Sequence, residues 1–317
     1  MSPELTIAGV GPSLDGILAR LQRGYGDPTT RRAGECWWRA AFTPEGPVLL
    51  QLTRAGADVR VTATGDGADW ALAQAPFLLG VDDHPELFTP DHAQLADLLR
   101  RRDVRVGGTD LLAEALATAI LEQKVTGAEA FTAIRRLVRR FGTPAPGAED
   151  EVHPAHGMYA SPPAGVWAAI PSWEYLQAGV EERRSATIRQ VMSRIGALER
   201  LLARHGADTL TIRAQALEDA LRALSGIGPW TAAKVRQQVL GDPDAWSVDD
   251  YHVPTVIGMR LGGEAAEVLE PFRPHRFRVE LLLMSLGMPE RHGPRRSLPN
   301  HLPVRGGWRG SGGRHGR

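Results

Sequence analysis

The feature that most constrains this chain is a pair of glycines, Gly226 and Gly228, which bracket one apolar residue between two helical patterns. The apolar spacing of Leu221 and Leu224 predicts the end of a helix just before them. Glycine lets a backbone turn tightly and approach a ligand closely. We therefore expect a helical hairpin over residues 215–240.

The second helix of this hairpin should begin at Pro229, because proline is tolerated in a first turn where its missing N–H has no role. The first N–H groups of a helix lack intrahelical partners, and the helix dipole adds partial positive charge there. Gly226, Gly228 and Thr231 are thus predicted to bind one phosphate of a polyanion. A simple connection between two helices explains the two glycines equally well. The choice between a phosphate site and a simple connection therefore depends on the neighbouring residues.

Composition limits the class of protein. The chain has 317 residues, enough for two cores, and no apolar run approaches the length of a membrane span. The first thirty residues lack a basic segment followed by an apolar stretch, so we expect a cytoplasmic location. Cys36 is the only cysteine, which excludes a four-cysteine metal or iron–sulfur site. His153 and His156 lie in a loop-like stretch without further ligands, and no metal site built from side chains is expected.

Charge is distributed unevenly along the chain. The net charge is zero, yet residues 271–317 hold 10 basic and 2 acidic groups. The segment 291–317 is rich in arginine and glycine, and we expect it to be a disordered basic tail. Its arginines would add salt-sensitive affinity for a polyanion. They are Arg291, Arg295, Arg296, Arg305, Arg309, Arg314 and Arg317.

The N-terminal third predicts an α+β domain over residues 1–106. A short helix is expected near Leu14–Leu21, followed by three strands that form an antiparallel meander. Two helical stretches, residues 67–80 and 91–102, should cover one face of this sheet. The strand-like runs are Cys36–Phe42, Val48–Thr53 and Val59–Ala63, and Trp37 and Trp38 are expected to be core residues.

From residue 107 to residue 290 the pattern is helical, which predicts a mostly α-helical domain and an α+β class overall. Two helices precede a Pro/Gly-rich loop over residues 143–172, and one amphipathic helix is expected from Ser185 to about Ala203. After the hairpin, two more helices are expected at about residues 249–260 and 275–287.

The string Leu224-Ser-Gly-Ile-Gly-Pro-Trp-Thr-Ala232, followed by Val248-Asp-Asp-Tyr-His252, resembles the helix-hairpin-helix DNA glycosylases. This superfamily includes endonuclease III and 3-methyladenine DNA glycosylase II (AlkA). The single cysteine narrows the resemblance to the AlkA-like branch, which lacks an iron–sulfur cluster. The resemblance implies duplex DNA with a damaged base as partner and no cofactor. It also implies a Na⁺ or K⁺ on the hairpin carbonyls of Arg222, Leu224 and Ile227.

The resemblance implies that Asp250 is the catalytic carboxylate. Cleavage of an N-glycosidic bond builds positive charge on the sugar, and a fixed carboxylate stabilises that charge and accepts a proton from water. The pattern Ser247-x-x-Asp250 also fits a helix cap, which is the structural alternative. The hairpin upstream favours the catalytic role.

A flipped base must be held between flat side chains. Trp230 stands where lyase-competent members place a Schiff-base lysine and where AlkA has tryptophan, so the resemblance implies a monofunctional enzyme. Tyr251 and Trp173 are further candidates for the base pocket. Lys234 falls where AlkA has another pocket aromatic, and it is expected to contact DNA.

Four more residues are expected to contact DNA. Gln123 matches the residue that the family inserts at the flipped site, and Lys124 replaces a leucine wedge. Arg273 and Arg276 match an Arg-Pro-x-Arg segment and are expected to pair with phosphate.

We therefore expect a monomeric, nucleoid-associated glycosylase that removes alkylated bases of the 3-methyladenine type from duplex DNA. Two alternatives stay open at this point. One is a bifunctional glycosylase and AP lyase with Lys124 or Lys234 as the amine. The other is a non-catalytic helix-hairpin-helix protein that only binds DNA.

Overall fold

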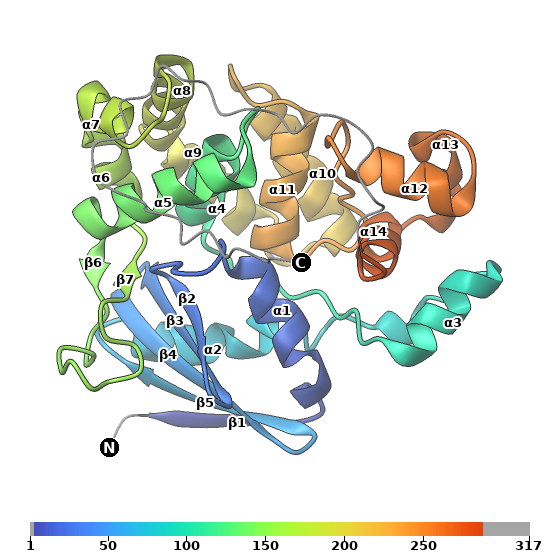
Figure 1. The fold of residues 1–317 in the computed structure, drawn as a ribbon, viewed down its shortest axis with the longest axis horizontal. Coiled ribbons are helices and arrows are strands. Elements are labelled where there is room, and N and C mark those ends of the chain that lie inside the picture. The colour runs from blue at the N-terminus through green and yellow to red at the C-terminus, as the bar shows by residue number, and fades with distance from the viewer. Residues whose placement is uncertain (1–2, 288–317) are drawn as a thin grey trace, which may run out of the picture.

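A computed structural model describes residues 3–287 and shows an antiparallel sheet followed by helices, as the α+β prediction requires (Figure 1). The predicted tail, residues 291–317, lies outside the described residues. The sheet has the order β1-β5-β4-β3-β2. Its strands are β1 (Glu4–Ile7), β2 (Thr30–Ala33), β3 (Cys36–Thr43), β4 (Gly46–Ala55) and β5 (Asp58–Thr64).

Three strands and the helix α1 (Leu14–Leu21) were predicted from the sequence, and their positions are confirmed. The short outer strands β1 and β2 were not predicted. Each has four residues and forms an edge of the sheet, so neither carries a long alternating pattern that sequence can reveal.

The two adjacent tryptophans of β3 are both buried, as expected, and they point to opposite faces of the sheet. Trp37 belongs to a cluster with residues of α1 and of α2 (Ala68–Leu78). Trp38 belongs to a second cluster with Ala145, Ala155 and Met158. Part of the stretch that was predicted to be a loop, residues 143–172, therefore covers the second face of the sheet.

This covering segment contains a short ribbon of β6 (Thr143–Pro144) and β7 (Tyr159–Ala160) and is followed by α6 (Ala164–Ala169). The prediction of a long loop over residues 143–172 is therefore only partly correct, because this stretch contains the β6–β7 ribbon and α6. The segment is held in place by burial of its small apolar residues against the sheet.

The helix predicted at residues 91–102 exists as α3 (Ala93–Arg101), but the prediction that it covers the sheet was wrong. Leu95 and Leu98 are buried in a cluster with residues of α12 (Val253–Leu261) and α14 (Arg276–Met284). Figure 1 shows α3 beside α14 and away from the strands. The predicted division of the chain near residue 106 stays a prediction.

The helical part is built around α4 (Leu112–Leu121), which contacts α5 (Gly127–Phe141), α8 (Glu182–Met192) and α11 (Pro229–Leu240). The single helix predicted from Ser185 to Ala203 is two helices, α8 and α9 (Ile195–Arg204). The break at Ser193 lets both Met192 and Ile195 point into the same core. The remaining helices are α7 (Ser172–Gln177), α10 (Leu210–Arg222) and α13 (Ala265–Leu269).

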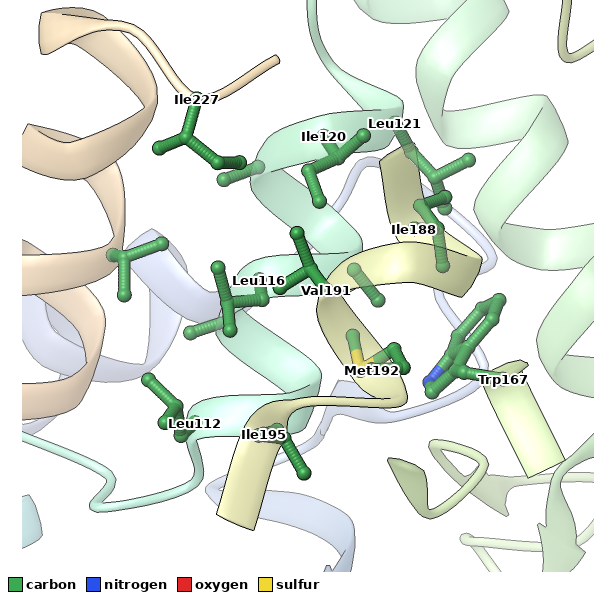
Figure 2. Close-up of a cluster of buried hydrophobic side chains, with 14 of the residues drawn as sticks. Leu112, Leu116, Ile120, Leu121, Trp167, Ile188, Val191, Met192, Ile195 and Ile227 are labelled. Carbon is green, nitrogen blue, oxygen red and sulfur yellow. The ribbon is translucent and has the colours of Figure 1, made fainter. Parts of the chain in front are cut away.

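The hairpin consists of α10, a turn and α11, and it begins at Leu210, earlier than predicted. Ile227, the residue between the two glycines, is buried in the same cluster as Leu116, Ile120 and Val191 (Figure 2). Burial of this one side chain fixes the turn to the core while its backbone stays at the surface. No helix within residues 3–287 is long and apolar enough to cross a membrane.

Candidate active site

The turn of the hairpin requires glycine at its first position. Gly226 has φ of 86°, a left-handed conformation that strains other residues. A Cβ atom at this position would lie 2.5 Å from Oγ1 of Thr187, on the neighbouring helix α8. Gly226 therefore serves the fold itself.

Gly228 is different. Its φ of −97° is open to any residue, and a Cβ atom there would meet nothing within 4 Å. The fold alone thus does not demand a glycine here. A missing side chain at the N-terminus of α11 keeps the surface open at the point where unpaired N–H groups can bind an anion.

Gln123 lies against the hairpin, and its side-chain amide faces the hydroxyl of Thr231 on α11. Nε2 of Gln123 donates to Oγ1 of Thr231 (2.8 Å) and to the carbonyl oxygen of Gly226 (3.0 Å). Thr231 is buried, and its hydroxyl oxygen already accepts from Gln123. Gln123 joins the α4–α5 loop to the hairpin turn.

Lys124 follows Gln123 and is exposed. Its φ is 55°, an unusual conformation for a residue with a side chain. Such strain is kept where the surrounding structure or a function demands it. The structure thus places a cation at the surface next to the residue that contacts the hairpin.

Asp250 lies in the turn before α12, and three donors hold its carboxylate. Nε1 of Trp230 donates to Oδ2 (2.9 Å), and the backbone N–H groups of His252 (2.9 Å) and Val253 (3.2 Å) donate to Oδ1. Burial by itself would raise the pKa of Asp250. The hydrogen bonds from His252 and Trp230 and the charge of Lys234 outweigh it and lower the pKa below its usual value. The carboxylate is therefore fixed in position and ionised at neutral pH.

The helix-cap alternative has limited support, because Asp250 accepts from the N–H of Val253, the first residue of α12, while the N-cap itself is His252 and has no side-chain cap. A true capping box is absent here. The backbone N–H of Ser247 donates to Glu280 and not to Asp250.

Trp230 lies in the first turn of α11, and its indole N–H donates to Asp250. Nζ of Lys234, one helical turn later, lies 5.8 Å from the centre of the indole ring. One face of the ring is therefore shared with a cation, which is a favourable cation–π geometry. Sequence reasoning expected a pocket wall at Trp230 but missed its hydrogen bond to the carboxylate.

A buried carboxylate, Glu280 of α14, was also missed. It accepts from the backbone N–H (2.7 Å) and from Oγ (2.8 Å) of Ser247, whose carbonyl in turn accepts from the N–H of Asp250 (3.2 Å). Burial raises the pKa of Glu280 even though Lys234 and Ser247 act in the opposite direction. The available signal was a lone acidic residue within an apolar helix pattern.

Comparisons with known proteins support the resemblance. The chain matches no protein-family model. It is 30% identical over 239 residues to a Mycobacterium tuberculosis protein described as "Probable bifunctional transcriptional activator/DNA repair enzyme AlkA", with 71% of this chain covered. The match spans only 43% of that relative, so this chain corresponds to less than half of its length.

Two solved structures share the fold. A 3-methyladenine DNA-glycosylase from Archaeoglobus fulgidus superposes with a TM-score of 0.65 at 17% identity, covering 89% of this chain and 97% of that one. A Clostridium acetobutylicum 8-oxoguanine glycosylase/lyase in complex with double-stranded DNA gives a TM-score of 0.62 at 12% identity, covering 87% and 91%. This chain belongs to the helix-hairpin-helix DNA glycosylase superfamily. The expected resemblance, in its AlkA-like form, is confirmed.

Two residues expected in the base pocket of this AlkA-like glycosylase fold lie in different places. Tyr251 follows Asp250, is 69% exposed and has its ring 4.7 Å from that of His252. Trp173 is on α7, which packs against α5 and α8. Figure 1 shows α7 and α12 on opposite sides of the molecule, so the structure does not bring Trp173 to the site.

The two arginines expected to bind phosphate are held in ion pairs. Arg276 pairs with Asp244 (2.6 Å), and Arg273 pairs with Glu270 (2.6 Å) and with Asp244 (3.2 Å). Arg276 is mostly buried, so its guanidinium fastens the start of α14 to the loop that follows α11. Contact of either arginine with phosphate stays a prediction.

Proposed function

We propose that this protein is a monofunctional DNA glycosylase, which hydrolyses the N-glycosidic bond of alkylated bases of the 3-methyladenine type in duplex DNA. The observation that carries the proposal is the Asp250 carboxylate, held by three donors beside the hairpin. The same position on α11 that would have to supply a Schiff-base amine holds Trp230.

The chemistry is a displacement at the anomeric carbon of a flipped nucleotide. As the bond to the base breaks, its electron pair leaves with the base, and positive charge builds on the sugar. Asp250 stabilises this charge and accepts a proton from the water whose oxygen bonds to the anomeric carbon. An alkylated purine already carries a positive charge, so it departs as a neutral base without an added proton.

The remaining residues position the substrate. Backbone N–H groups at Gly228 and Thr231 hold one phosphate, and Lys124 enters the duplex where the base leaves it. Trp230 and Tyr251 provide flat surfaces for the base. The carbonyls of Arg222, Leu224 and Ile227 form the proposed site for Na⁺ or K⁺. The carbonyl oxygen of Leu224 also accepts from the backbone N–H of Ile227 (3.2 Å).

Lys234 bears on the choice of lesion. Its charge beside the Trp230 ring opposes a second cation on that ring. A lesion panel should therefore contain neutral 8-oxoguanine and hypoxanthine in addition to 3-methyladenine. If only the neutral bases are released, the protein is a glycosylase, but the proposal that it removes alkylated bases is wrong.

The test is single-turnover excision from methylated duplex, with alkali-labile abasic sites as the readout. Wild type should release the base, and Asp250→Asn should be slower by at least 100-fold. Asp249→Asn is the matched control, because Asp249 is exposed, adjacent and, with φ of 59°, in a conformation that asparagine tolerates. An Asp250→Asn protein that excises as fast as wild type contradicts the mechanism.

The lyase alternative has one observation in its favour, the closeness of Lys234 to Trp230 and Asp250. Borohydride trapping on substrate DNA tests it. A covalent adduct that disappears in Lys234→Met or Lys124→Met would replace the monofunctional proposal. Binding without base release across the whole panel would support the non-catalytic alternative.

A further inference from the structure

The most exposed large hydrophobic side chain in residues 3–287 lies outside the site. Tyr25, between α1 and β2, is 99% exposed. It stands between Gly24 (φ 74°) and Gly26 (φ 88°), both in left-handed conformations. A fully exposed aromatic ring adds no burial energy to the fold, and tyrosine is a common anchor residue at interfaces.

The loop that presents Tyr25 is firmly built. Asp27 accepts hydrogen bonds from the backbone N–H groups of Arg23, Thr29 (2.7 Å) and Thr30 (3.3 Å). A Cβ atom on Gly24 would lie 2.8 Å from the ring of Phe131, so the loop packs closely on α5. The exposure of Tyr25 is therefore a property of an ordered loop.

This loop is next to the α4–α5 loop that carries Lys124. Arg23 forms an ion pair with Glu122 (2.7 Å), which directly precedes Gln123, and Gln123 contacts the hairpin. The loop of Tyr25 thus contacts the α4–α5 loop, and the α4–α5 loop contacts the hairpin turn.

Arginines lie beside Tyr25: Arg135 and Arg31 are its neighbours, and Arg139 and Asp27 lie near Arg31. Arg135 donates to the carbonyl oxygen of Tyr25 (2.9 Å), and Arg31 donates to the carbonyl oxygens of Pro154 and His156 (both 3.0 Å). Within residues 3–287, neither these two arginines nor Arg139 forms an ion pair with a carboxylate. Burial lowers the pKa of Arg31, and the nearby charge of Arg139 lowers it further.

We propose that Tyr25, together with Arg135 and Arg139, forms a second contact for duplex DNA beside the point where Gln123 and Lys124 meet it. The ring packs against a base or sugar that is unstacked next to the lesion, and the arginines pair with flanking phosphates. An exposed aromatic ring among unpaired cations is the combination that nucleic acid recognises. This inference rests on the proposed function, since it presumes DNA at the hairpin.

The test measures binding to a duplex with a non-cleavable abasic analogue by fluorescence anisotropy. Tyr25→Ala should weaken binding about tenfold, within the range for loss of one base–aromatic stack. Tyr25→Phe should bind within about twofold of wild type, because the ring is kept. Leu87→Ala is the control, since Leu87 is 71% exposed and lies next to α3, away from this loop.

The charge contribution is measured by salt titration. Arg139→Ala should reduce the slope of log affinity against log salt by about 0.9, the value for one phosphate contact. Arg100→Ala on α3 should leave the slope unchanged.

Unchanged affinity in Tyr25→Ala, at an unchanged melting temperature, overturns this inference. So does equal loss in Tyr25→Ala and Tyr25→Phe. Wild-type protein that neither binds nor processes any lesion duplex would instead overturn the proposed function, and a protein partner for Tyr25 would then have to be sought.

Discussion

The two hairpin glycines should respond in opposite ways to the same substitution, because only one of them is required by the fold. Gly226→Ala forces a left-handed residue, at about 1–2 kcal/mol. It also places a Cβ atom 2.5 Å from Oγ1 of Thr187, a buried side chain that itself bonds to the carbonyl of Arg183. Such overpacking costs about 1–3 kcal/mol.

The two effects together predict that Gly226→Ala lowers the free energy of unfolding by about 2–5 kcal/mol. For a chain of 317 residues the melting temperature should fall by roughly 3–8 °C. Gly228→Ala should leave it unchanged or raise it slightly. Its φ of −97° suits alanine, the new methyl group meets no atom within 4 Å, and alanine restricts the unfolded chain.

The effect on DNA affinity should be in the reverse order, with Gly228→Ala weakening binding more than Gly226→Ala. A methyl group on Gly228 stands where a phosphate must approach the first N–H groups of α11. Loss of a hydrogen bond to a charged group costs about 1.5–3 kcal/mol, or roughly 10- to 100-fold in affinity.

Two assays on the same preparations check this prediction, thermal unfolding and anisotropy with an abasic-analogue duplex. At a temperature where both variants are folded, Gly228→Ala should bind far more weakly than wild type. If Gly228→Ala binds DNA as wild type does, the proposed phosphate site at α11 is wrong. If the two substitutions destabilise the protein equally, the assignment of Gly226 to the fold is wrong.

The remaining predictions concern the two carboxylates. Trp230→Phe removes a donor to Asp250 and so raises the pKa of that carboxyl. Because excision needs the ionised carboxylate, the acid limb of the plot of excision rate against pH should move to higher pH. If the acid limb does not move, the indole N–H does not have this role. Glu280 has a raised pKa, so the native state holds its proton more tightly than the unfolded state and stability should fall as pH rises through the native pKa. Glu280→Gln should abolish that fall in a plot of melting temperature against pH. Ser247→Ala should lower the free energy of unfolding by about 1–3 kcal/mol, because it leaves the buried carboxylate of Glu280 short of a hydrogen-bond donor.

Much of the site could be predicted from the chain alone because its residues are close in sequence. The hairpin, Trp230 and Asp250 all lie within residues 210–250, and glycine, proline and helical spacing have strong local signatures. The strands of the meander were predicted for the same reason, since adjacent strands and tight turns are local features.

The failures concern packing between distant segments. Helix α3 was expected on the sheet, but Leu95 and Leu98 pack with α12 and α14, some 150 residues away. The segment that follows α5 was predicted only as a loop, and the sequence did not show that its small apolar residues cover the sheet. Periodicity shows that a helix has an apolar face and cannot show which partner covers that face.

Sequence by itself determined that this chain has a helical hairpin, an α+β class and a candidate carboxylate at Asp250. The tertiary structure decided what these residues contact. It joined Gln123 to the turn, turned Arg276 toward Asp244 and placed Glu280 behind the loop of Asp250. Hydrogen bonds and ion pairs depend on side chains that converge from distant elements, and only the packing of the whole core brings those elements together.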